Sequence, residues 1–180
     1  GILAREIRDV SARRGERTRV RQLHWGGGTP TYLSPDEMIE LDRVTREHFE
    51  LEPDREQAIE IDPRVTTFEQ LAVLKDLGCN RLSLGVQDFT PEVQQAVNRV
   101  QSYEDTKAQI DEARRLGFGS INVDLIYGLP RQTVETYQQA LEQVLTLRPE
   151  RVAVYSYAHM PWLKANQRRV GDDDLPSPDT

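Results

Sequence analysis

The stretch RVRQLHWGGGTP, residues 19–30, passes from an apolar, strand-like segment directly into three glycines and a proline. Four more short runs rich in β-favouring residues follow, at 57–61, 81–86, 120–127 and 151–157, and each ends in polar or glycine residues. Segments with helical spacing of apolar residues separate these runs. The alternation predicts β/α units whose strands, starting with 19–25, form a parallel sheet.

Capping residues mark where the intervening helices begin. SPDE at 34–37 and TFEQ at 67–70 match the capping box, in which the first side chain and the fourth cap each other's backbone. The predicted helices follow Ser34, Thr67, Thr90, Ser102 and Thr133, and a further helix is expected at the very start of the chain.

Every predicted strand ends in polar, charged or glycine residues of the kinds that form binding or catalytic sites. They are Gly26–Thr29, Glu60 with Asp62, Gln87 with Asp88, Asp124 with Gly128, and finally Tyr155, Tyr157 and His159. A doubly wound open sheet would gather its ligand groups near one switch point, whereas a curved sheet brings every strand end to a common axis. The sequence therefore predicts an α/β fold, a partial (β/α) barrel of about five β/α units.

Composition narrows the class of protein further. The 180 residues carry 30 acidic and 23 basic side chains, a net charge of −7, which disfavours nucleic acid and anionic membranes as partners. No apolar run approaches the roughly 18 residues of a membrane span. We expect a cytoplasmic monomer.

The single cysteine, Cys79, excludes an internal disulfide and a multi-cysteine metal site built by this chain alone. Cys79 itself is expected to be a small buried residue that fills space in the core.

Several candidate site residues keep a structural alternative. The three glycines could bind an anionic group through backbone N–H groups or could form only a tight turn. Glu60 and Asp62 share one strand face, and a buried carboxylate there needs a partner. The partner could be a cationic or hydroxyl-bearing ligand, or an internal arginine or lysine. Asp62 could also merely shape the turn at Pro63. Asp124 interrupts an apolar strand, which indicates an inward carboxylate, while Arg99 taken alone suggests a solvated surface residue.

The three histidines do not have the spacing of a metal site. His24 is expected in the core or at an edge of the sheet, and His48 near the solvent boundary of a helix. His159 is the better functional candidate because it follows a strand end.

Six segments together resemble one family: HWGGGTPTYLSP (24–35), IEIDPR (59–64), NRLSLGVQDF (80–89), VNR (97–99), NVDLIYGLPRQT (122–133) and YAHMP (157–161). The family is the oxygen-independent coproporphyrinogen III oxidases of the radical S-adenosylmethionine superfamily. The resemblance implies a partial β/α barrel, here at residues 1–170 and lacking its first strand, followed by a polar connector at 171–180 that leads toward a further C-terminal region.

The resemblance also implies cofactors and contacts. They would be a [4Fe–4S] cluster and two molecules of S-adenosylmethionine, the first contacted by Gly27 and Glu60. Contacts to the second would come from Gly28, Thr29, Gln87, Arg99, Asp124 and Ala158. The CxxxCxxC cluster motif of the family does not occur in these residues, and the resemblance implies that it lies upstream of Gly1. The chain by itself is therefore expected to be inactive.

The implied reaction is the oxidative decarboxylation of two propionates of coproporphyrinogen III to vinyl groups, giving protoporphyrinogen IX, with an electron donor as partner. Catalytic residues stay unassigned. The cations nearest to the motifs, which could receive the substrate, are Arg99, Arg131, Lys164, Arg168 and Arg169.

Three other functions remain open at this point. The related haem chaperone branch keeps the same barrel and shares the GVQ-like and GLPRQT-like segments. A nicotinamide-dependent oxidoreductase is disfavoured because Thr31 stands where the dinucleotide fingerprint needs its third glycine. The chain could also be a catalytically silent scaffold.

The cysteine count leads to a direct test. Treating this 180-residue chain with iron and sulfide should give no cluster absorbance, because three thiolates are needed and the chain offers one. A stable cluster held through Cys79 would contradict the assignment.

Overall fold

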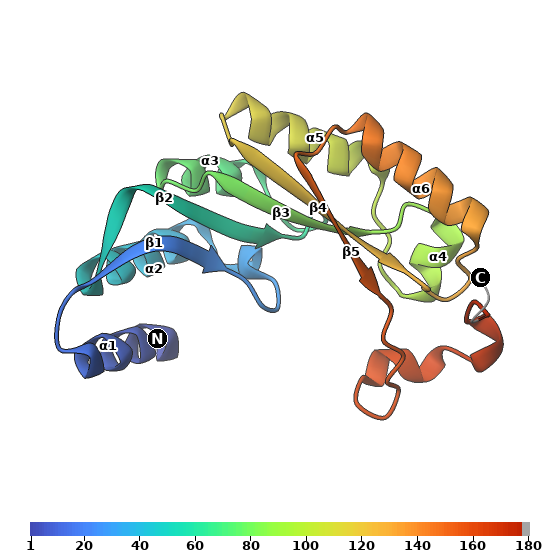
Figure 1. Ribbon diagram of the computed structural model, residues 1–180, viewed down its shortest axis with the longest axis horizontal. Coiled ribbons are helices and arrows are strands. Elements are labelled where there is room, and N and C mark those ends of the chain that lie inside the picture. The colour runs from blue at the N-terminus through green and yellow to red at the C-terminus, as the bar shows by residue number, and fades with distance from the viewer. Residues whose placement is uncertain (178–180) are drawn as a thin grey trace.

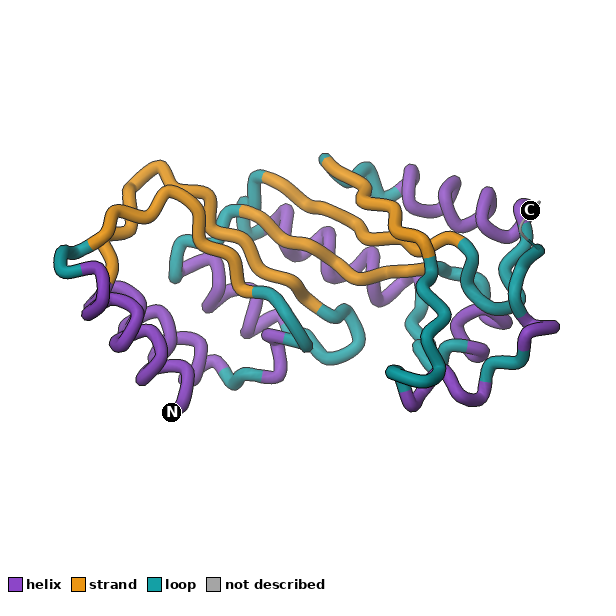
Figure 2. Tube along the Cα trace, turned by 60° about the horizontal axis from the view of Figure 1, so that its bottom comes forward, coloured by secondary structure: helices purple, strands orange, loops and turns teal. Residues whose placement is uncertain are grey.

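A computed structural model describes residues 1–177, except for the side chains of residues 166 and 172. Five strands, β1 (Thr18–Trp25), β2 (Phe49–Ile61), β3 (Arg81–Gln87), β4 (Ser120–Tyr127) and β5 (Arg151–Ser156), form one all-parallel sheet. Their spatial order equals their order in the chain, and Figure 2 shows them as a curved row. A doubly wound sheet would reverse its order at a switch point. The predicted partial barrel is confirmed.

Helices occupy the segments between the strands. They are α1 (Ile2–Arg14), α2 (Pro35–His48), α3 (Phe68–Asp76), α4 (Pro91–Ala96), α5 (Tyr103–Arg115) and α6 (Val134–Thr146), with short 3₁₀ turns η1 (Pro30–Tyr32), η2 (Ala165–Arg169) and η3 (Asp172–Asp174). In Figure 1, α3, α5 and α6 lie along one face of the sheet. Within residues 1–177, no helix is long and apolar enough to cross a membrane.

The helix starts agree with the sequence. Ser34, Thr67 and Thr133 each form a complete capping box, and the Ser102 hydroxyl accepts a hydrogen bond from the Asp105 N–H. Thr90 precedes α4 as expected, although its side chain makes no capping hydrogen bond. These caps satisfy N–H groups that the first turn of a helix leaves without partners.

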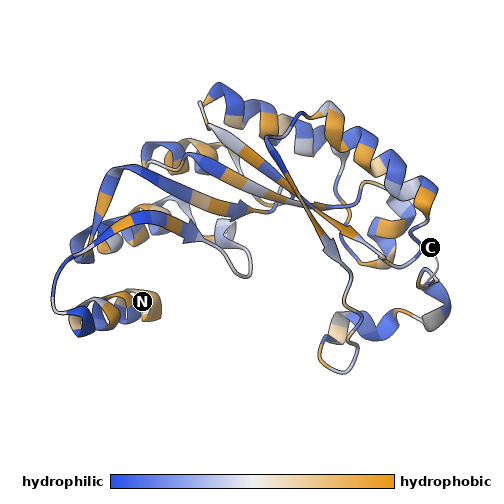
Figure 3. Ribbon diagram, in the orientation of Figure 1, coloured by the Kyte–Doolittle hydropathy of each residue, from blue (hydrophilic) through white to orange (hydrophobic). Residues whose placement is uncertain are grey.

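The core lies between the sheet and the helices on its outer face. Leu82, Leu84, Ile121 and Val123 point into it from the two central strands and are inaccessible to solvent. The helices meet them with one apolar stripe each, and Figure 3 shows hydrophobic and hydrophilic residues alternating along α5 and α6. Cys79 is buried in this core, as predicted.

Strand β2 departs most from the sequence prediction, because it starts at Phe49 rather than at residue 57. Its first half pairs only with β1, in the register Thr18↔Phe49, and β3 joins β2 only from Ala58. Backbone pairing at the edge of the sheet, rather than apolar burial, supports this half. Its sequence, FELEPDRE, is therefore mostly charged and gives no alternating signal. β5 ends at Ser156, one residue earlier than predicted.

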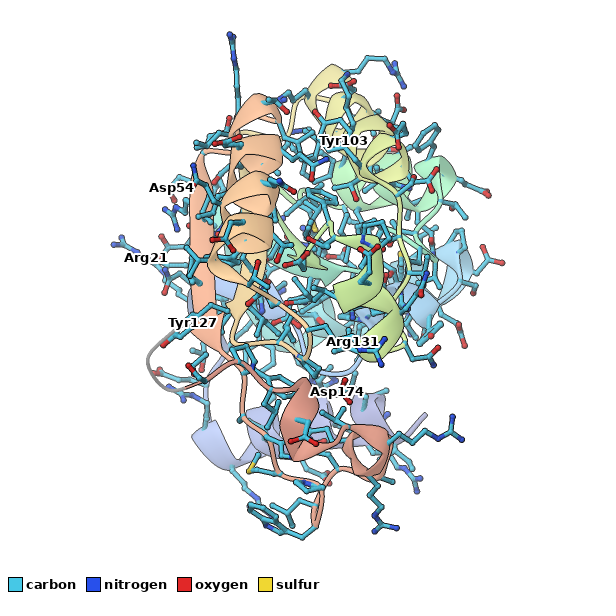
Figure 4. The ribbon with its side chains drawn as sticks, turned by 90° about the vertical axis from the view of Figure 1, so that its right-hand side faces the viewer. Arg21, Asp54, Tyr103, Tyr127, Arg131 and Asp174 are labelled. Atoms are coloured by element: carbon cyan, nitrogen blue, oxygen red, sulfur yellow. The ribbon has the colours of Figure 1, made fainter. Side chains whose placement is uncertain are left out.

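The segment after β5 returns toward the barrel. Arg131, in the loop after β4, donates a hydrogen bond from Nε to the Asp174 carboxylate at 3.1 Å, and the two side chains lie together in Figure 4. Leu175 and Pro176 are half-buried. This part of the predicted connector 171–180 therefore contacts the barrel, while residues 178–180 lie outside the described residues.

Core packing generates a stability prediction. Leu84→Ala should lower the free energy of unfolding by about 2–5 kcal/mol, because it leaves a cavity at an inaccessible site of the central strand β3. Leu145→Ala, on the solvent side of α6, is the control and should change it by less than about 0.5 kcal/mol. Urea unfolding measures both variants, and an equal loss of unfolding free energy in the two would contradict this position of the core.

Candidate functional site

A pocket of about 140 Å³ opens at the carboxyl ends of β1 to β4, on the concave face of the sheet. Six of the eight residues implied by the resemblance line it: Gly28, Thr29, Glu60, Gln87, Arg99 and Asp124. Five of them come from the ends of four different strands, and Arg99 comes from the segment between α4 and α5. The curvature of the sheet therefore brings together residues that are far apart in the sequence. We call this the strand-end pocket.

The other two residues lie outside that lining. Gly27 is adjacent, since its N–H donates a hydrogen bond to Glu60 Oε2 at 3.2 Å. Ala158 follows β5, and its carbonyl accepts a hydrogen bond from Gln167 Nε2 at 3.0 Å. Seven of the eight residues therefore lie in or next to the strand-end pocket, and Ala158 is not among the residues that line it.

Glu60 is fixed by the glycine loop and by His24, whose Nε2 lies 3.2 Å from Glu60 Oε1. A Cβ on Gly26 would lie 2.6 Å from His24 Nε2 and 2.8 Å from Glu60 Oε1, so any larger residue would displace these two side-chain ends. His24 is half-exposed on the edge strand, which settles its placement at the edge rather than in the core. The Glu60 carboxylate is 45% exposed and available to a cationic or N–H-bearing ligand.

Asp124 points to the concave face, as its place in an apolar strand predicted. It accepts hydrogen bonds from Ser83 Oγ at 3.0 Å and from Asn122 Nδ2 at 2.7 Å. All three residues alternate with core residues on β3 and β4, so the pleat alone sends them to the same face. An ionised carboxylate only accepts, and Asp124 therefore suits a ligand with hydroxyl or N–H groups.

Asp62 is the centre of an ion cluster. Its side chain is only 6% exposed and accepts hydrogen bonds from Arg64 Nε at 3.0 Å and Arg64 Nη2 at 2.6 Å, while Arg99 Nη2 lies 3.5 Å away. Burial by itself would raise the pKa of Asp62, but the hydrogen bonds of Arg64 and the charge of Arg99 outweigh it and hold that pKa below its usual value. For Asp62, the internal arginine anticipated from the sequence is present.

Arg99 is not the solvated surface residue that its isolated position suggested. Its side chain is 26% exposed, and Nη2 donates a hydrogen bond to the Gly85 carbonyl at 2.9 Å. A Cβ on Gly85 would lie 2.9 Å from Arg99 Nη2 and 2.9 Å from Gln87 Nε2. Glycine at this position therefore lets both side chains reach the strand-end pocket.

Gln87 adopts a backbone φ of 70° where β3 ends, and the register with β4 shifts between Gly85 and Gln87. A non-glycine residue in this left-handed region costs about 1–2 kcal/mol. The local irregularity turns the Gln87 amide toward the pocket, and strain of this kind concentrates at functional sites.

The hydrogen bonds that connect the loops around this pocket were not predicted from the sequence. Gln132 Nε2 donates a hydrogen bond to Asp88 Oδ2 at 2.6 Å, and Gln132 Oε1 accepts one from the Gly128 N–H at 2.7 Å. One buried amide thus ties the loop after β3 to the loop after β4. The GLPRQT segment contains Gln132, but only the fold brings it to Asp88.

A larger cavity lies elsewhere. About 640 Å³ in volume, it lies between α6, the end of β4 and residues 175–177, and its lining includes His159, Tyr137 and Tyr157. Its walls are mainly apolar, and it shares no lining residue with the strand-end pocket. His159 therefore lies apart from the strand-end pocket.

Comparisons with known proteins assign the class. The family model described as the radical SAM superfamily matches residues 2–144, so the chain belongs to the radical S-adenosylmethionine superfamily. It is 48% identical over 178 residues to the oxygen-independent coproporphyrinogen III oxidase of Pseudomonas aeruginosa, covering 98% of this chain and 39% of that protein. The corresponding Escherichia coli enzyme is 50% identical over 159 residues, which are 88% of this chain and 35% of that enzyme.

Solved structures agree. Coproporphyrinogen III oxidase (HemN) from Escherichia coli superposes with a TM-score of 0.93 at 47% identity, over 98% of this chain and 41% of that one. The radical S-adenosylmethionine methyltransferase TsrM from Kitasatospora setae, at 16% identity, has a TM-score of 0.65 over 86% of this chain and 30% of that one, and shares the fold. The chain spans about two fifths of the length of the oxidases it matches.

Membership of the superfamily implies S-adenosylmethionine and a [4Fe–4S] cluster as cofactors. The strand-end pocket fits the first: Glu60 and Asp124 offer acceptors for amino and hydroxyl groups, and Arg99 offers donors for a carboxylate. The residues do not fit the cluster. Cys79 is the one cysteine of the 180 residues, and burial raises the pKa of its thiol to about 12. Across residues 1–177, no group of three potential metal ligands occurs.

The Asp62 cluster predicts a pH dependence. Asp62→Asn should lower the free energy of unfolding by about 2–3 kcal/mol at pH 7, because it removes charge-assisted hydrogen bonds from a buried group. Since the pKa of Asp62 is lower in the folded chain, this stabilisation is complete above about pH 4 and is lost as pH falls through the folded value.

Urea unfolding at pH 7 and at pH 3 measures the effect. The gap between wild type and Asp62→Asn should narrow at the lower pH. Asp111→Asn, which removes an exposed ion pair with Lys107, is the matched control and should cost less than about 1 kcal/mol. A gap of the same size at both values would show that the charge of Asp62 does not stabilise the fold.

Proposed function

We propose that this chain is the S-adenosylmethionine-binding part of an oxygen-independent coproporphyrinogen III oxidase. The reaction would convert two propionates of coproporphyrinogen III to vinyl groups. Each propionate would lose one hydrogen atom to the radical derived from S-adenosylmethionine, one electron to an acceptor, and carbon dioxide. Relatives and a solved structure of that name support the proposal at 47–50% identity. The observation that carries it is the convergence on one pocket of six motif residues, five from four strand ends and Arg99 from the segment after α4.

The pocket suggests how the residues divide the binding of S-adenosylmethionine. Glu60, joined to the Gly27 N–H, would hold the amino-acid end of one molecule. Asp124 and Gln87 would hold a second molecule beside Gly28 and Thr29, with Arg99 at its carboxylate. When bound, S-adenosylmethionine supplies the radical that removes hydrogen from a propionate side chain. The chain's own residues bind and orient it.

The proposed enzyme also needs a cluster and an electron donor, and this chain does not supply the cluster ligands. The cluster needs thiolates that these 180 residues do not supply, and the reaction needs an electron donor. A nicotinamide cofactor is disfavoured, because the glycine loop leads into the short turn η1 rather than opening an α-helix. A monomeric, cytoplasmic protein without a nucleic-acid partner stays a prediction.

The strained residue Gln87 offers a binding test with a matched control. Gln87→Gly should weaken S-adenosylmethionine binding about three- to tenfold, because it removes the amide that faces the pocket. It should leave the free energy of unfolding unchanged or raise it by about 1 kcal/mol, because it relieves a positive φ. Arg148→Gly relieves the same strain at an exposed loop and should leave binding unchanged.

Isothermal titration calorimetry on the full-length protein that carries this chain, together with urea unfolding, supplies both readouts. Loss of affinity in both variants, or in neither, would remove Gln87 from the site. Mass spectrometry of coproporphyrinogen III incubated with the reduced protein then tests the reaction. Loss of two carbon dioxide molecules is expected, and haem binding without any loss would instead identify a haem chaperone.

A further inference from the structure

A second pocket adjoins the strand-end pocket and differs from it in charge. Its volume is about 340 Å³, and both pockets share Gln87 and Arg99. The strand-end pocket contains three carboxylates, those of Glu60, Asp62 and Asp124. The charged side chains that line the second pocket are Arg64 and Arg99, and its described lining includes no carboxylate. We call it the arginine pocket.

Asp62 holds the two guanidinium groups side by side. It is nearly inaccessible behind them, at 6% exposure, and is hydrogen-bonded to Arg64 and within 3.5 Å of Arg99. Two positive charges against one negative charge leave the cluster with a net charge of +1. Arg64 and Arg99 line the arginine pocket and Asp62 does not. The net positive charge of the cluster therefore faces any ligand in that pocket.

Both arginines keep hydrogen-bond donors beyond those that Asp62 and Gly85 use. A guanidinium has five N–H donors. Arg64 uses Nε and Nη2 on Asp62, and within residues 1–177 its Nη1 has no partner. Arg99 Nε is buried and has no hydrogen-bond partner among the described residues. A buried donor without a partner is costly, and an acceptor brought by a ligand would satisfy it.

We propose that Arg64 is a second anion-binding residue, which acts with Arg99 on one carboxylate of a ligand in the arginine pocket. Paired guanidinium groups match the planar geometry of a carboxylate and bind it through charge-assisted hydrogen bonds. The inference deepens the proposed function and rests on it for the identity of the ligands. The carboxylate belongs either to S-adenosylmethionine or to a propionate of the porphyrinogen.

Arg64→Gln in the full-length protein tests the assignment, with Arg115→Gln as control. Arg115 also pairs with a nearby carboxylate, Glu112, but is exposed on α5. The probes are S-adenosylmethionine and its decarboxylated analogue in one arm, and coproporphyrin III and its tetramethyl ester in the other. Arg64→Gln should weaken one of the two carboxylate-bearing probes about tenfold or more and leave its carboxylate-free partner unchanged. The affected arm identifies the source of the carboxylate.

Arg64→Lys covers the case in which Arg64→Gln destabilises the fold by leaving Asp62 with one partner fewer. The lysine keeps a positive charge near Asp62 but loses the guanidinium fork, so affinity for the same probe should still fall several-fold. In the wild-type protein, the same probe should also protect Arg64 and Arg99 from phenylglyoxal, as measured by peptide mass spectrometry. Protection requires no variant and no catalytic turnover.

The outcomes separate the two proposals. The role of Arg64 would be overturned if the folded variants bound both carboxylate-bearing probes as tightly as the wild type does. Equal weakening of the carboxylate-free probes would also overturn it, and so would a lack of protection of Arg64. A wild-type protein that binds neither S-adenosylmethionine nor coproporphyrin III would overturn the proposed function itself.

Discussion

The parallel register of β2, β3 and β4 is the constraint on which the site depends. Glu60 pairs with Ser83 across β2 and β3, and Gly85 pairs with Asp124 across β3 and β4. Because side chains alternate between the two faces, this register sends the carboxylates to the concave face and the branched apolar residues to the core. A shift of one residue in β2 or in β4 would turn Glu60 or Asp124 toward the helices.

The same register separates charges along the open face. Carboxylates gather where β2 and β4 end, and two guanidinium groups lie beyond them, with Gln87 and Arg99 shared by both pockets. A ligand with amino or hydroxyl groups at one end and a carboxylate at the other would find complementary partners along this line. Asp62 makes the arrangement possible, because it neutralises part of the charge that would otherwise drive Arg64 and Arg99 apart.

Local chemistry made much of the fold predictable. The central strands were predictable because Leu82, Leu84, Ile121 and Val123 are separated by residues of the other face. Two helix starts were predictable because their capping boxes lie within four residues. The meeting of the polar strand ends also followed, since parallel strands of a curved sheet end on one axis.

Features that depend on tertiary contacts were not predictable. The first half of β2 is stabilised by pairing with β1 and carries no apolar pattern. Arg99 looked like a surface residue because its partners, Asp62 and Gly85, are distant in the sequence. The bridge from Gln132 to Asp88 spans 44 residues and exists only once both loops are placed.

A crystal structure of the protein with S-adenosylmethionine bound tests the central claim most directly. The ligand should lie in the strand-end pocket, within hydrogen-bond distance of Glu60 or Asp124 and beside Gly28. A ligand found instead in the apolar cavity beside α6, against Tyr137 and His159, would contradict it.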